Sequence, residues 1–508
     1  MAVQSGGRAV ERGVDRLKPG SVGLVGVVFM AVATAAPITA MTGNLPIVVG
    51  QGNGADAPAA YVVATLVLTV FSVGYVAMAR HITAAGAFYG YVSHGLGRVV
   101  GMAAGLLALL AYVAFEASVV GFFAYALRGL VRAQLGVDLG WGWYAAAGLL
   151  VIGVMAWFDL HLTARVLGVA LVLEVGVLGA VSLAVLAAGG GPDGIVGEAV
   201  NPLNALKGVG GSGAAAAGLG LFFAFTSWVG FESTAMYGEE SRDPKRVVPR
   251  ATLASVVGVG LFYVFVSWMI VSGNGVEHAV AVASGAVPGK DGNSLFFDPL
   301  GAHLGAWAVR VFQWLVVTGS FACAMAFHQC AARYLYAIGR ERFLHPALGR
   351  THPRHGSPHV ASVVQSGIAA GLVLAFLAAG MDPYLHLYTL LALLGTMAIL
   401  IVQTLCSFAV VGYFHVLGRH PETRHWFRTL TAPVAGGVAM AGVVALLVVN
   451  RGTAAGAAAG TLLFRLIPYL VIGAFAGGIV LALVMRWRRP ELYARMGRIV
   501  LEDAAERD

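Results

Sequence analysis

Three glutamates lie inside strongly apolar stretches of this 508-residue chain: Glu116 in AYVAFEASVV, Glu174 in VALVLEVGVL and Glu232 in WVGFESTA. An acid at the centre of a membrane helix costs roughly 2.5–3.5 kcal/mol on insertion scales, so it faces a protein interior or a watery cavity. Each of the three could bind and release a proton or help to hold a cation. The alternative for each is a neutral acid that hydrogen-bonds a backbone carbonyl.

The surroundings of Glu232 predict a helix that can be interrupted. A glycine costs about 1 kcal/mol in a helix interior relative to alanine, and hydroxyl groups compete for backbone hydrogen bonds. Non-helical backbone at membrane depth is tolerated only where it lines a cavity. The small and hydroxyl-bearing residues around this acid are Thr226, Ser227, Gly230, Ser233 and Thr234.

The first apolar stretch, FMAVATAAPITAMTGNLPIVV, carries a matching irregularity. Pro37 lacks an amide hydrogen and clashes with the carbonyl four residues earlier, so it kinks or breaks a helix and frees carbonyls near Ala33 and Thr34. The centres near 37 and 230 begin two consecutive sets of five helices. Corresponding breaks in two halves are the best pointer from sequence to a transporter binding site at the membrane midplane. A kinked helix without a ligand is the alternative.

The composition predicts a membrane-embedded protein that positions these residues on helices. The chain is 58% hydrophobic and 11% charged, whereas soluble domains carry about 25% charged residues. Twelve apolar stretches are long enough to cross a hydrocarbon core of roughly 30 Å. They are approximately 21–50, 59–79, 99–127, 143–157, 163–188, 215–238, 250–273, 305–338, 359–380, 385–414, 432–449 and 462–485.

The basic residues predict the orientation. With a cytoplasmic N-terminus, 25 of the 32 Lys and Arg residues fall on the inside, as the positive-inside rule requires. We therefore expect a multi-pass protein of the cytoplasmic membrane with both termini in the cytoplasm. The polar start, residues 1–20, is expected to be a tail and not a signal peptide. The net charge of +8 is spread over many short loops, which argues against a nucleic-acid partner.

Nothing in the sequence predicts catalysis. Cys323, Cys330 and Cys406 lie within apolar stretches and are expected to be small packing residues. The chain has no metal-ligand spacing, nucleophile elbow or phosphate-binding loop. We expect neither an enzyme nor a bound metal or cofactor.

Four stretches resemble the amino acid–polyamine–organocation superfamily of secondary permeases. The most specific is similar to that family's sixth span and the loop after it, with the patterns G-F-E, E-E and D-P-x-R-x-x-P-R. The other three resemble the start of span 3, span 5 and the end of span 8. The stretches are FFAFTSWVGFESTAMYGEESRDPKRVVPRA (222–251), AGAFYGYVSHGLGRVVG (85–101), TARVLGVALVLEVGVL (163–178) and AARYLYAIGRERFLHPALGR (331–350).

The resemblance implies an all-α fold of the leucine-transporter type, with twelve transmembrane helices and breaks in helices 1 and 6. Two inverted five-helix repeats would occupy 21–188 and 215–414, and two peripheral helices would occupy 432–485. Short cytoplasmic tails, 1–20 and 486–508, would flank them.

The resemblance also implies a substrate site at the two breaks. In such a site the carboxylate of an amino acid meets free amides, and its ammonium group meets free carbonyls. This chain reads TAAPI where many relatives carry a Gly-Ser-Gly-type triplet, and Pro37 can offer only its carbonyl. Phe225 and Trp228 would form a thin aromatic gate. The expected site residues are Ala35, Ala36, Pro37, Ile38 and Thr39 on helix 1, and Phe225, Thr226, Ser227, Trp228 and Gly230 on helix 6.

A second departure from the family concerns coupling. Several proton-coupled relatives carry a lysine nine residues after the arginine of span 5, and counting nine from Arg165 gives Glu174. Glu232 matches the glutamate of G-F-E, which is implicated in proton sensing in some relatives, and Glu116 is the third candidate. We expect coupling to a proton gradient. Sodium coupling, exchange and uncoupled transport are the alternatives.

The loop EESRDPKRVVPRA is expected to form a cytoplasmic gate through Glu239, Glu240, Arg242 and Arg250, and a merely solvated loop is the alternative. The glycine-rich stretches 189–218 and 273–304 are expected to be loops. The tail RWRRPELYARMGR resembles a basic segment at the membrane surface.

Taken together, the sequence favours a permease that moves a small amino acid by alternating access, with a small molecule and membrane lipid as its partners. The serines, threonines and aromatic residues near the breaks suggest a neutral or mixed amino acid. A polyamine or cationic amino acid permease or exchanger, with Glu116 or Glu232 as counter-charge, is the first alternative. A transporter-like nutrient sensor is the second.

Overall fold

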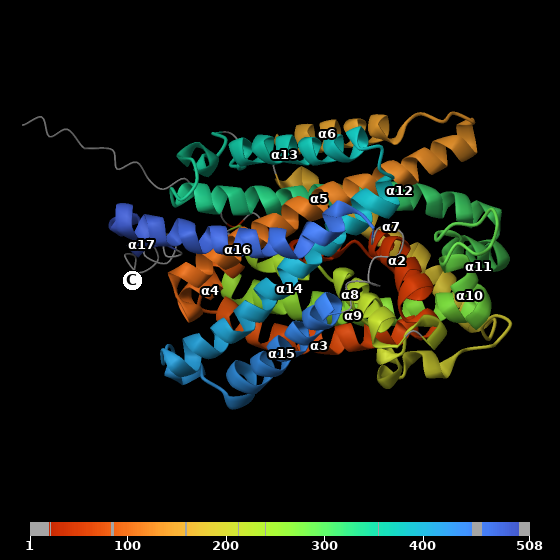
Figure 1. Cartoon of the computed structure of the whole chain (residues 1–508), viewed down its shortest axis with the longest axis horizontal. Coiled ribbons are helices and arrows are strands. Elements are labelled where there is room, and N and C mark those ends of the chain that lie inside the picture. The colour runs from red at the N-terminus through yellow and green to blue at the C-terminus, as the bar shows by residue number, and fades with distance from the viewer. Residues whose placement is uncertain are drawn as a thin grey trace, which may run out of the picture.

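The computed structural model describes residues 20, 22–82, 86–157, 160–211, 213–238, 240–353, 355–449 and 460–496. Within these ranges every regular element is a helix, and the helices form one elongated bundle (Figure 1). Ten helical stretches of the described residues are long and apolar enough to cross a membrane. Two shorter apolar helices, Trp141–Trp157 and Leu171–Ala187, complete the twelve that the sequence predicts.

The membrane helices lie within a few residues of the predicted spans, apart from extensions at two ends. Helix α5 continues to Leu135, where Gly136 in the left-handed conformation ends it. Helix α9 begins at Pro244, whose fixed φ suits the first helical position. In chain order the helices are α1 (Leu24–Ala35), α2 (Pro37–Ile47), α3 (Ala57–Ala79), α5 (Arg98–Leu135), α6 (Trp141–Trp157), α7 (Leu160–Ala187), α8 (Ala214–Thr226), η6 (Phe231–Tyr237), α9 (Pro244–Asn274), α12 (Ala306–Arg340), α13 (His359–Ala378), α14 (Thr389–Val411), α15 (Ala432–Val449) and α16 (Leu462–Arg488).

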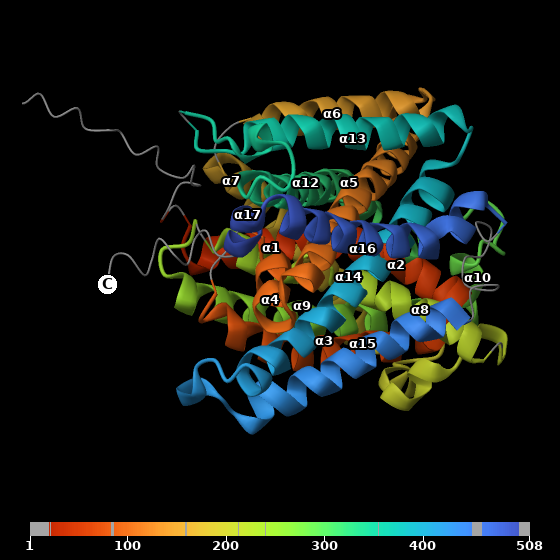
Figure 2. The ribbon, with the colours of Figure 1, turned by 60° about the vertical axis from the view of Figure 1, so that its left-hand side comes forward.

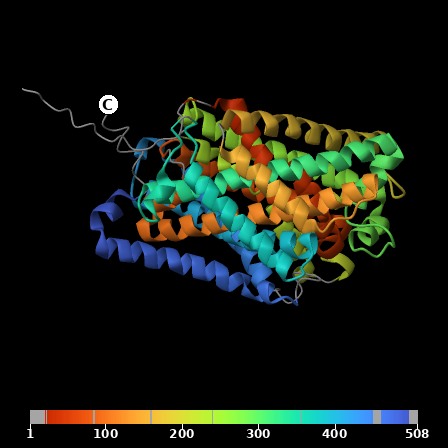
Figure 3. The ribbon, with the colours of Figure 1, turned by 90° about the horizontal axis from the view of Figure 1, so that it is seen from above.

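The contacts between helices follow a five-plus-five pattern. Three pairs join a span to the span five places later: α3 packs on α9, α5 on α12, and α6 on α13. Two further sets of contacts occur as exchanged pairs: α1 packs on α9 as α8 packs on α3, and α5 packs on α14 as α12 packs on α7. Figure 2 shows α6 and α13 together on one side of the bundle. Helix α16, the long blue helix of Figure 3, lies along the outer edge.

One prediction about the connections was wrong. The stretch 273–304 was expected to be a loop, but it contains two helices, α10 (Val276–Ala283) and α11 (Ser294–Leu304). Glycines in the left-handed region, Gly275 and Gly305, separate these helices from their neighbours. The glycines therefore mark helix boundaries here, and an apolar face on each helix packs against the bundle.

The two ends of the bundle are formed by different elements of the chain. We call the end with the start of α1, the short helix α4 (Phe88–Leu96) and the C-terminal helix α17 (Pro490–Arg495) the basic end, and the end with α10 and α11 the loop end. Figure 1 shows them at the left and right of the bundle. A backbone bridge between Val22 and Ser241 joins the start of α1 to the segment after η6 at the basic end.

Candidate binding site between two interrupted helices

The first span is interrupted at Ala36, as predicted. Helix α1 ends at Ala35, Ala36 adopts φ 44° and ψ 80°, and α2 begins at Pro37. Proline suits the first position of the new helix, because its missing N–H would have no helical partner there. The hydroxyl of Tyr263 donates to the Ala35 carbonyl at 2.9 Å, and the Cys323 thiol lies 3.5 Å from the Thr34 carbonyl. Neighbouring side chains therefore hold the carbonyls that the break releases.

The sixth span is interrupted at the predicted place as well. Helix α8 ends at Thr226, and a turn leads to Gly230, which has φ 119° and precedes the 3-10 helix η6. A Cβ atom on Gly230 would lie 2.6 Å from Cγ2 of Thr34 and 2.8 Å from the backbone nitrogen of Ala35. Glycine is required here for its conformation and for the close approach. The two breaks thus contact each other directly.

A cavity of about 30 Å³ lies beside this contact. Among the described residues that line it, none is an Asp, Glu, Lys or Arg. The Thr39 hydroxyl is buried and has no hydrogen-bond partner within the described ranges. The rings of Phe115 and Phe327 stack with their centroids 5.0 Å apart in the wall. The lining residues are Thr34, Ala35, Thr39, Ala40, Asn44, Phe115, Ser118, Val119, Thr226, Val229, Cys323, Phe327, Tyr388 and Ala392.

The predicted site residues divide into two groups around this cavity. Ala35, Thr39 and Thr226 line it, and Thr226 also shares a 2.8 Å hydrogen bond with Thr396 of α14. The others lie at the two breaks without belonging to the lining: Ala36, Pro37, Ile38, Phe225, Ser227, Trp228 and Gly230.

The expected thin gate of Phe225 and Trp228 differs from the arrangement in the structure. Trp228 packs against Tyr61 and Tyr263, with ring centroids 5.8 and 5.1 Å away, and its indole nitrogen lies 3.4 Å from the Val256 carbonyl. This places the indole against α3 and α9 instead of the cavity. The aromatic side chains of the lining are Phe115, Phe327 and Tyr388.

Glu174 lies at the first break. Its carboxylate accepts a hydrogen bond of 3.4 Å from the backbone N–H of Ile38, at the start of α2. The side chain is buried against Gly319 of α12, where an added Cβ would lie 2.7 Å from Oε1. A helix N-terminus carries about +0.5 charge, so this is a favourable place for a carboxylate. Glu174 therefore joins α7, α2 and α12 at the interruption.

Glu232 occupies the equivalent position at the second break. Its carboxylate accepts hydrogen bonds from the Gly230 N–H at 3.0 Å and from the Tyr112 hydroxyl at 2.8 Å. Its own carbonyl accepts from the Tyr75 hydroxyl at 2.8 Å. A buried glutamate thus lies at the start of the second half of each interrupted span: Glu174, which comes from α7, at the first, and Glu232, which belongs to η6, at the second.

Glu116 belongs to a different cluster, behind the wall of the cavity. Its two oxygens contact His328 Nδ1 at 2.9 Å and the amide nitrogen of Gln365 at 2.6 Å. The other ring nitrogen of His328 lies 2.7 Å from the Ser362 hydroxyl. This cluster ties α5 to α12 and α13, and its carboxylate does not reach the lining.

The cavity is closed toward the loop end by hydrogen bonds among α2, the turn after α8 and the π-helix η8 (Pro383–Tyr388), which leads into α14. Asn44 donates to the Ser227 hydroxyl at 3.0 Å and accepts from the Tyr388 hydroxyl at 2.7 Å. The Tyr384 hydroxyl donates to the Gly43 carbonyl at 3.0 Å. We call this set the outer closure; it ties α2 and the turn after α8 to η8, just before α14.

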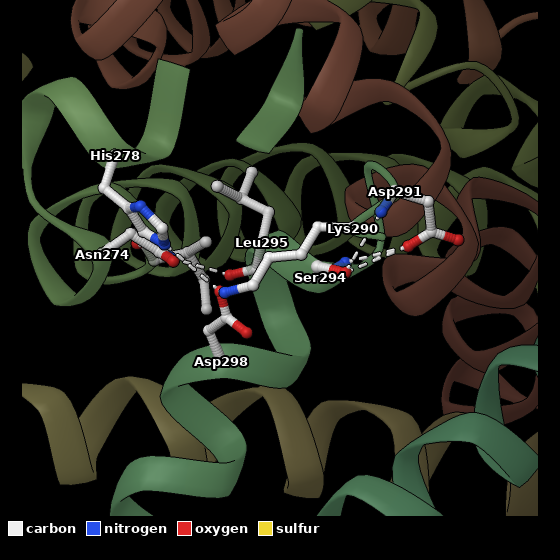
Figure 4. Close-up of polar contacts among 8 residues, drawn as sticks. Asn274, His278, Lys290, Asp291, Ser294, Leu295 and Asp298 are labelled. Atoms are coloured by element: carbon white, nitrogen blue, oxygen red, sulfur yellow. Dashed lines mark hydrogen bonds and ion pairs between the residues drawn. The ribbon is translucent and has the colours of Figure 1, made fainter. Parts of the chain in front are cut away.

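Further out, the ring of Tyr384 stacks on Tyr125 of α5, with centroids 5.1 Å apart. The Tyr125 hydroxyl donates to the Asp291 carboxylate at 2.7 Å. Figure 4 shows Asp291 beside Lys290, whose ammonium group lies 2.5 Å from Asp298 of α11. The segment between α10 and α11 is thereby anchored above the outer closure.

A buried ion pair between Glu240 and Arg333 closes the basic end. The loop motif predicted a gate role for Glu240 but not for Arg333. The guanidinium group of Arg333 on α12 binds both oxygens of Glu240 at 3.1 Å and lies 4.8 Å from the ring centre of Tyr237. Both charged side chains are at least 95% buried. The Val22 amide donates to the Glu240 carbonyl at 3.0 Å, which ties the start of α1 to the same pair.

The other predicted gate residues lie elsewhere. The side chains of Arg242 and Arg250 are exposed at the basic end. The Arg242 amide donates to the Val22 carbonyl at 3.1 Å, so its backbone takes part in the closure. Glu239 lies outside the described residues. We call the Glu240–Arg333 pair and its Val22 contacts the inner closure.

The chain matches a known protein family. The family model described as "Amino acid permease" matches residues 22–475, which include both breaks, all three glutamates and both closures. No curated protein matches the chain.

Proposed function

Because this chain belongs to the amino acid permease family, we propose that it moves a small neutral amino acid across the cytoplasmic membrane by alternating access. The observation that carries the proposal is the closed, uncharged cavity where the two breaks meet. A cavity of about 30 Å³ is far below the roughly 300–1,000 Å³ of sites for drug-sized ligands. At this size the cavity holds about one or two water molecules, so the lining must move apart even for a small amino acid, and a larger substrate would require more movement still.

The chemistry of the lining favours a neutral side chain on the substrate. Buried ionised groups need a partner of opposite charge, and the described lining residues supply none. A zwitterion can meet the ends of the half-helices instead, with its carboxylate toward the N-terminus of α2 and its ammonium group toward carbonyls at the end of α1. The Tyr263 hydroxyl and the Cys323 thiol each use one lone pair of such a carbonyl, and a carbonyl oxygen has two. The unpartnered hydroxyl of Thr39 is in place to bind one of these groups.

A polyamine or a cationic amino acid fits less well. The two carboxylates considered as counter-charges are engaged elsewhere: Glu116 with His328 and Gln365, and Glu232 with Gly230 and Tyr112. A dication in this cavity would have to break one of these sets of hydrogen bonds. That cost argues for the neutral substrate.

We assign the coupling role to Glu174 and the coupling ion to the proton. The Glu174 carboxylate accepts from Ile38, on the first turn of α2, so it competes with a substrate carboxylate for the same helix end. A proton on Glu174 would remove its negative charge and weaken its hold on that amide. Proton uptake would then free the end of α2 for the substrate, which is the requirement for symport.

Alternating access requires that the two closures open in turn. We place the basic end in the cytoplasm by the positive-inside rule, so the inner closure opens to the cytoplasm and the outer closure to the outside. The inner closure joins the segment after η6 and the residues just before α1 to α12. The outer closure joins α2 and the turn after α8 to η8, which leads into α14. The halves on either side of each break can therefore move separately.

The test is a substrate screen followed by uptake. Ligands that bind the native state raise the apparent melting temperature by mass action. Glycine, alanine and serine should raise it in the purified protein, whereas arginine and putrescine should not. Proteoliposomes should then accumulate the best ligand when an inward proton gradient is imposed without sodium. Stabilisation by putrescine or arginine alone would reverse the substrate assignment, and uptake that requires sodium would reverse the assignment of the ion.

A further inference from the structure

A second and much larger pocket lies at the basic end, away from the substrate cavity. Its volume is about 940 Å³, and it is formed where the α4–α5 junction, the end of α14 and helix α17 meet. Figure 1 shows α4 and α17 at the same end of the bundle. The lining combines basic and apolar side chains: His81, His94, Leu96, Arg98, Val416, Leu417, Arg419, His420 and Tyr493 are among them.

The permanent positive charge of this pocket comes from two arginines. Arg98 at the start of α5 and Arg419 in the segment after α14 both line it. Burial and the neighbouring His420 hold the pKa of His81 below its usual range, so His81 adds little charge near neutral pH. Among the described residues of the lining, none is an Asp or Glu. Glu422, just outside it, is hydrogen-bonded to His420 at 2.9 Å.

Arg98 is held in position for a ligand. Its guanidinium group donates to the Ala494 carbonyl of α17 at 2.7 Å and lies 5.5 Å from the ring centre of Tyr493. An arginine has five N–H donors in a fixed fork that matches phosphate geometry, and the bond to Ala494 uses one of them. Arg98 also begins α5, a helix of 38 residues whose positive end therefore faces the pocket.

Apolar residues on the rim distinguish this pocket from a site for a soluble anion. Leu96, Val416 and Leu417 are 36%, 79% and 52% exposed and line the same pocket as the arginines. They lie at the ends of membrane helices, where apolar side chains meet acyl chains and basic side chains meet headgroups. Basic pockets between transmembrane helices on the cytoplasmic side are suited to anionic lipid headgroups.

We propose that this pocket binds one anionic phospholipid, with its phosphate between Arg98 and Arg419 and its acyl chains over Leu96, Val416 and Leu417. The bound lipid would join α5, α14 and α17, three elements that belong to different parts of the fold. The C-terminal helix would then be fixed to the bundle by the lipid as well as by the contact of Arg98 with Ala494.

The experiment compares lipids and variants of the full-length protein in mild detergent. Phosphatidylglycerol should raise the melting temperature more than phosphatidylcholine does, and inorganic phosphate at the same concentration should have no effect. In the double variant R98Q/R419Q, roughly 30-fold more phosphatidylglycerol should be needed for the same shift, because each arginine at a membrane surface contributes about a fivefold gain in affinity. The double variant R98K/R419K keeps both positive charges and should retain most of the shift in melting temperature with phosphatidylglycerol. This result would show that the protein tolerates substitution at both positions.

The matched control is K245Q/R246Q, which removes two exposed charges at the basic end outside the pocket. This control should respond to phosphatidylglycerol like the unmodified protein. An equal loss of the phosphatidylglycerol effect in the control would show that the lipid stabilises the protein through overall charge. An equal shift of the melting temperature with inorganic phosphate would show a site for a soluble anion. Either result, or an equal shift with phosphatidylcholine, would overturn the proposal.

Discussion

The contact between the two breaks can be tested with a single methyl group at Gly230. In a Gly230→Ala variant the new Cβ would lie 2.6 Å from Cγ2 of Thr34 and 2.8 Å from the Ala35 nitrogen. Overpacking of this kind costs typically 1–3 kcal/mol, and an L-residue in the left-handed region costs roughly 1–2 kcal/mol more. The sum is about 2–5 kcal/mol against the arrangement in which the breaks meet. Since about 1.4 kcal/mol corresponds to a factor of ten, that state should become at least roughly 30-fold less populated.

The assays are substrate uptake into proteoliposomes and the thermal unfolding of the purified protein. Gly230→Ala should lower both the uptake rate and the melting temperature. The matched control is Gly258→Ala on α9, where an added Cβ meets nothing within 4 Å. That control should keep its uptake, and its stability should rise slightly, because alanine is favoured over glycine in a helix by about 1 kcal/mol. Normal uptake and stability in Gly230→Ala would refute the close contact of the breaks.

Three further predictions concern the coupling residue and the two closures. Glu174→Gln should bind substrate but lose the dependence of uptake on the proton gradient; a gradient dependence like that of the unmodified protein would remove Glu174 from the coupling role. Glu240→Gln leaves the Arg333 guanidinium buried without its carboxylate, which should cost about 3–5 kcal/mol; thermal unfolding should show a clear loss that the exposed Arg246→Gln does not. Tyr125→Phe removes the 2.7 Å bond to Asp291, worth about 1 kcal/mol, so substrate should dissociate roughly fivefold faster to the outside; an unchanged dissociation rate would show that this bond does not hold the outer closure.

Much of the helical architecture could be predicted because it follows from local chemistry. A run of apolar residues defines each span, and the two breaks were visible as Pro37 and Gly230 among small and hydroxyl-bearing neighbours. Glu174 was singled out as a coupling candidate by its spacing from Arg165 along one helix together with the family resemblance. These signals all lie within short stretches of the chain.

The wall of the cavity could not be predicted in the same way. Phe115, Cys323 and Phe327 are ordinary apolar residues in their own helices, and only the packing of α5 against α12 brings them to the breaks. Arg333 lies in the predicted span 305–338, and only the folded chain brings it to Glu240, with which it forms a buried pair. Trp228 was assigned to a gate on its sequence position, but packing against Tyr61 and Tyr263 decides its direction. Long-range contacts settle each of these cases.

The central claim is that a small neutral amino acid binds where the first and sixth spans are interrupted. The most direct measurement is a cryo-electron microscopy map of the purified protein with the amino acid that stabilises it most. The account predicts ligand density beside Thr39 and Thr226, between helices interrupted at Ala36 and Gly230. Density for the amino acid at any other place, or two helices that continue unbroken through the membrane, would contradict it.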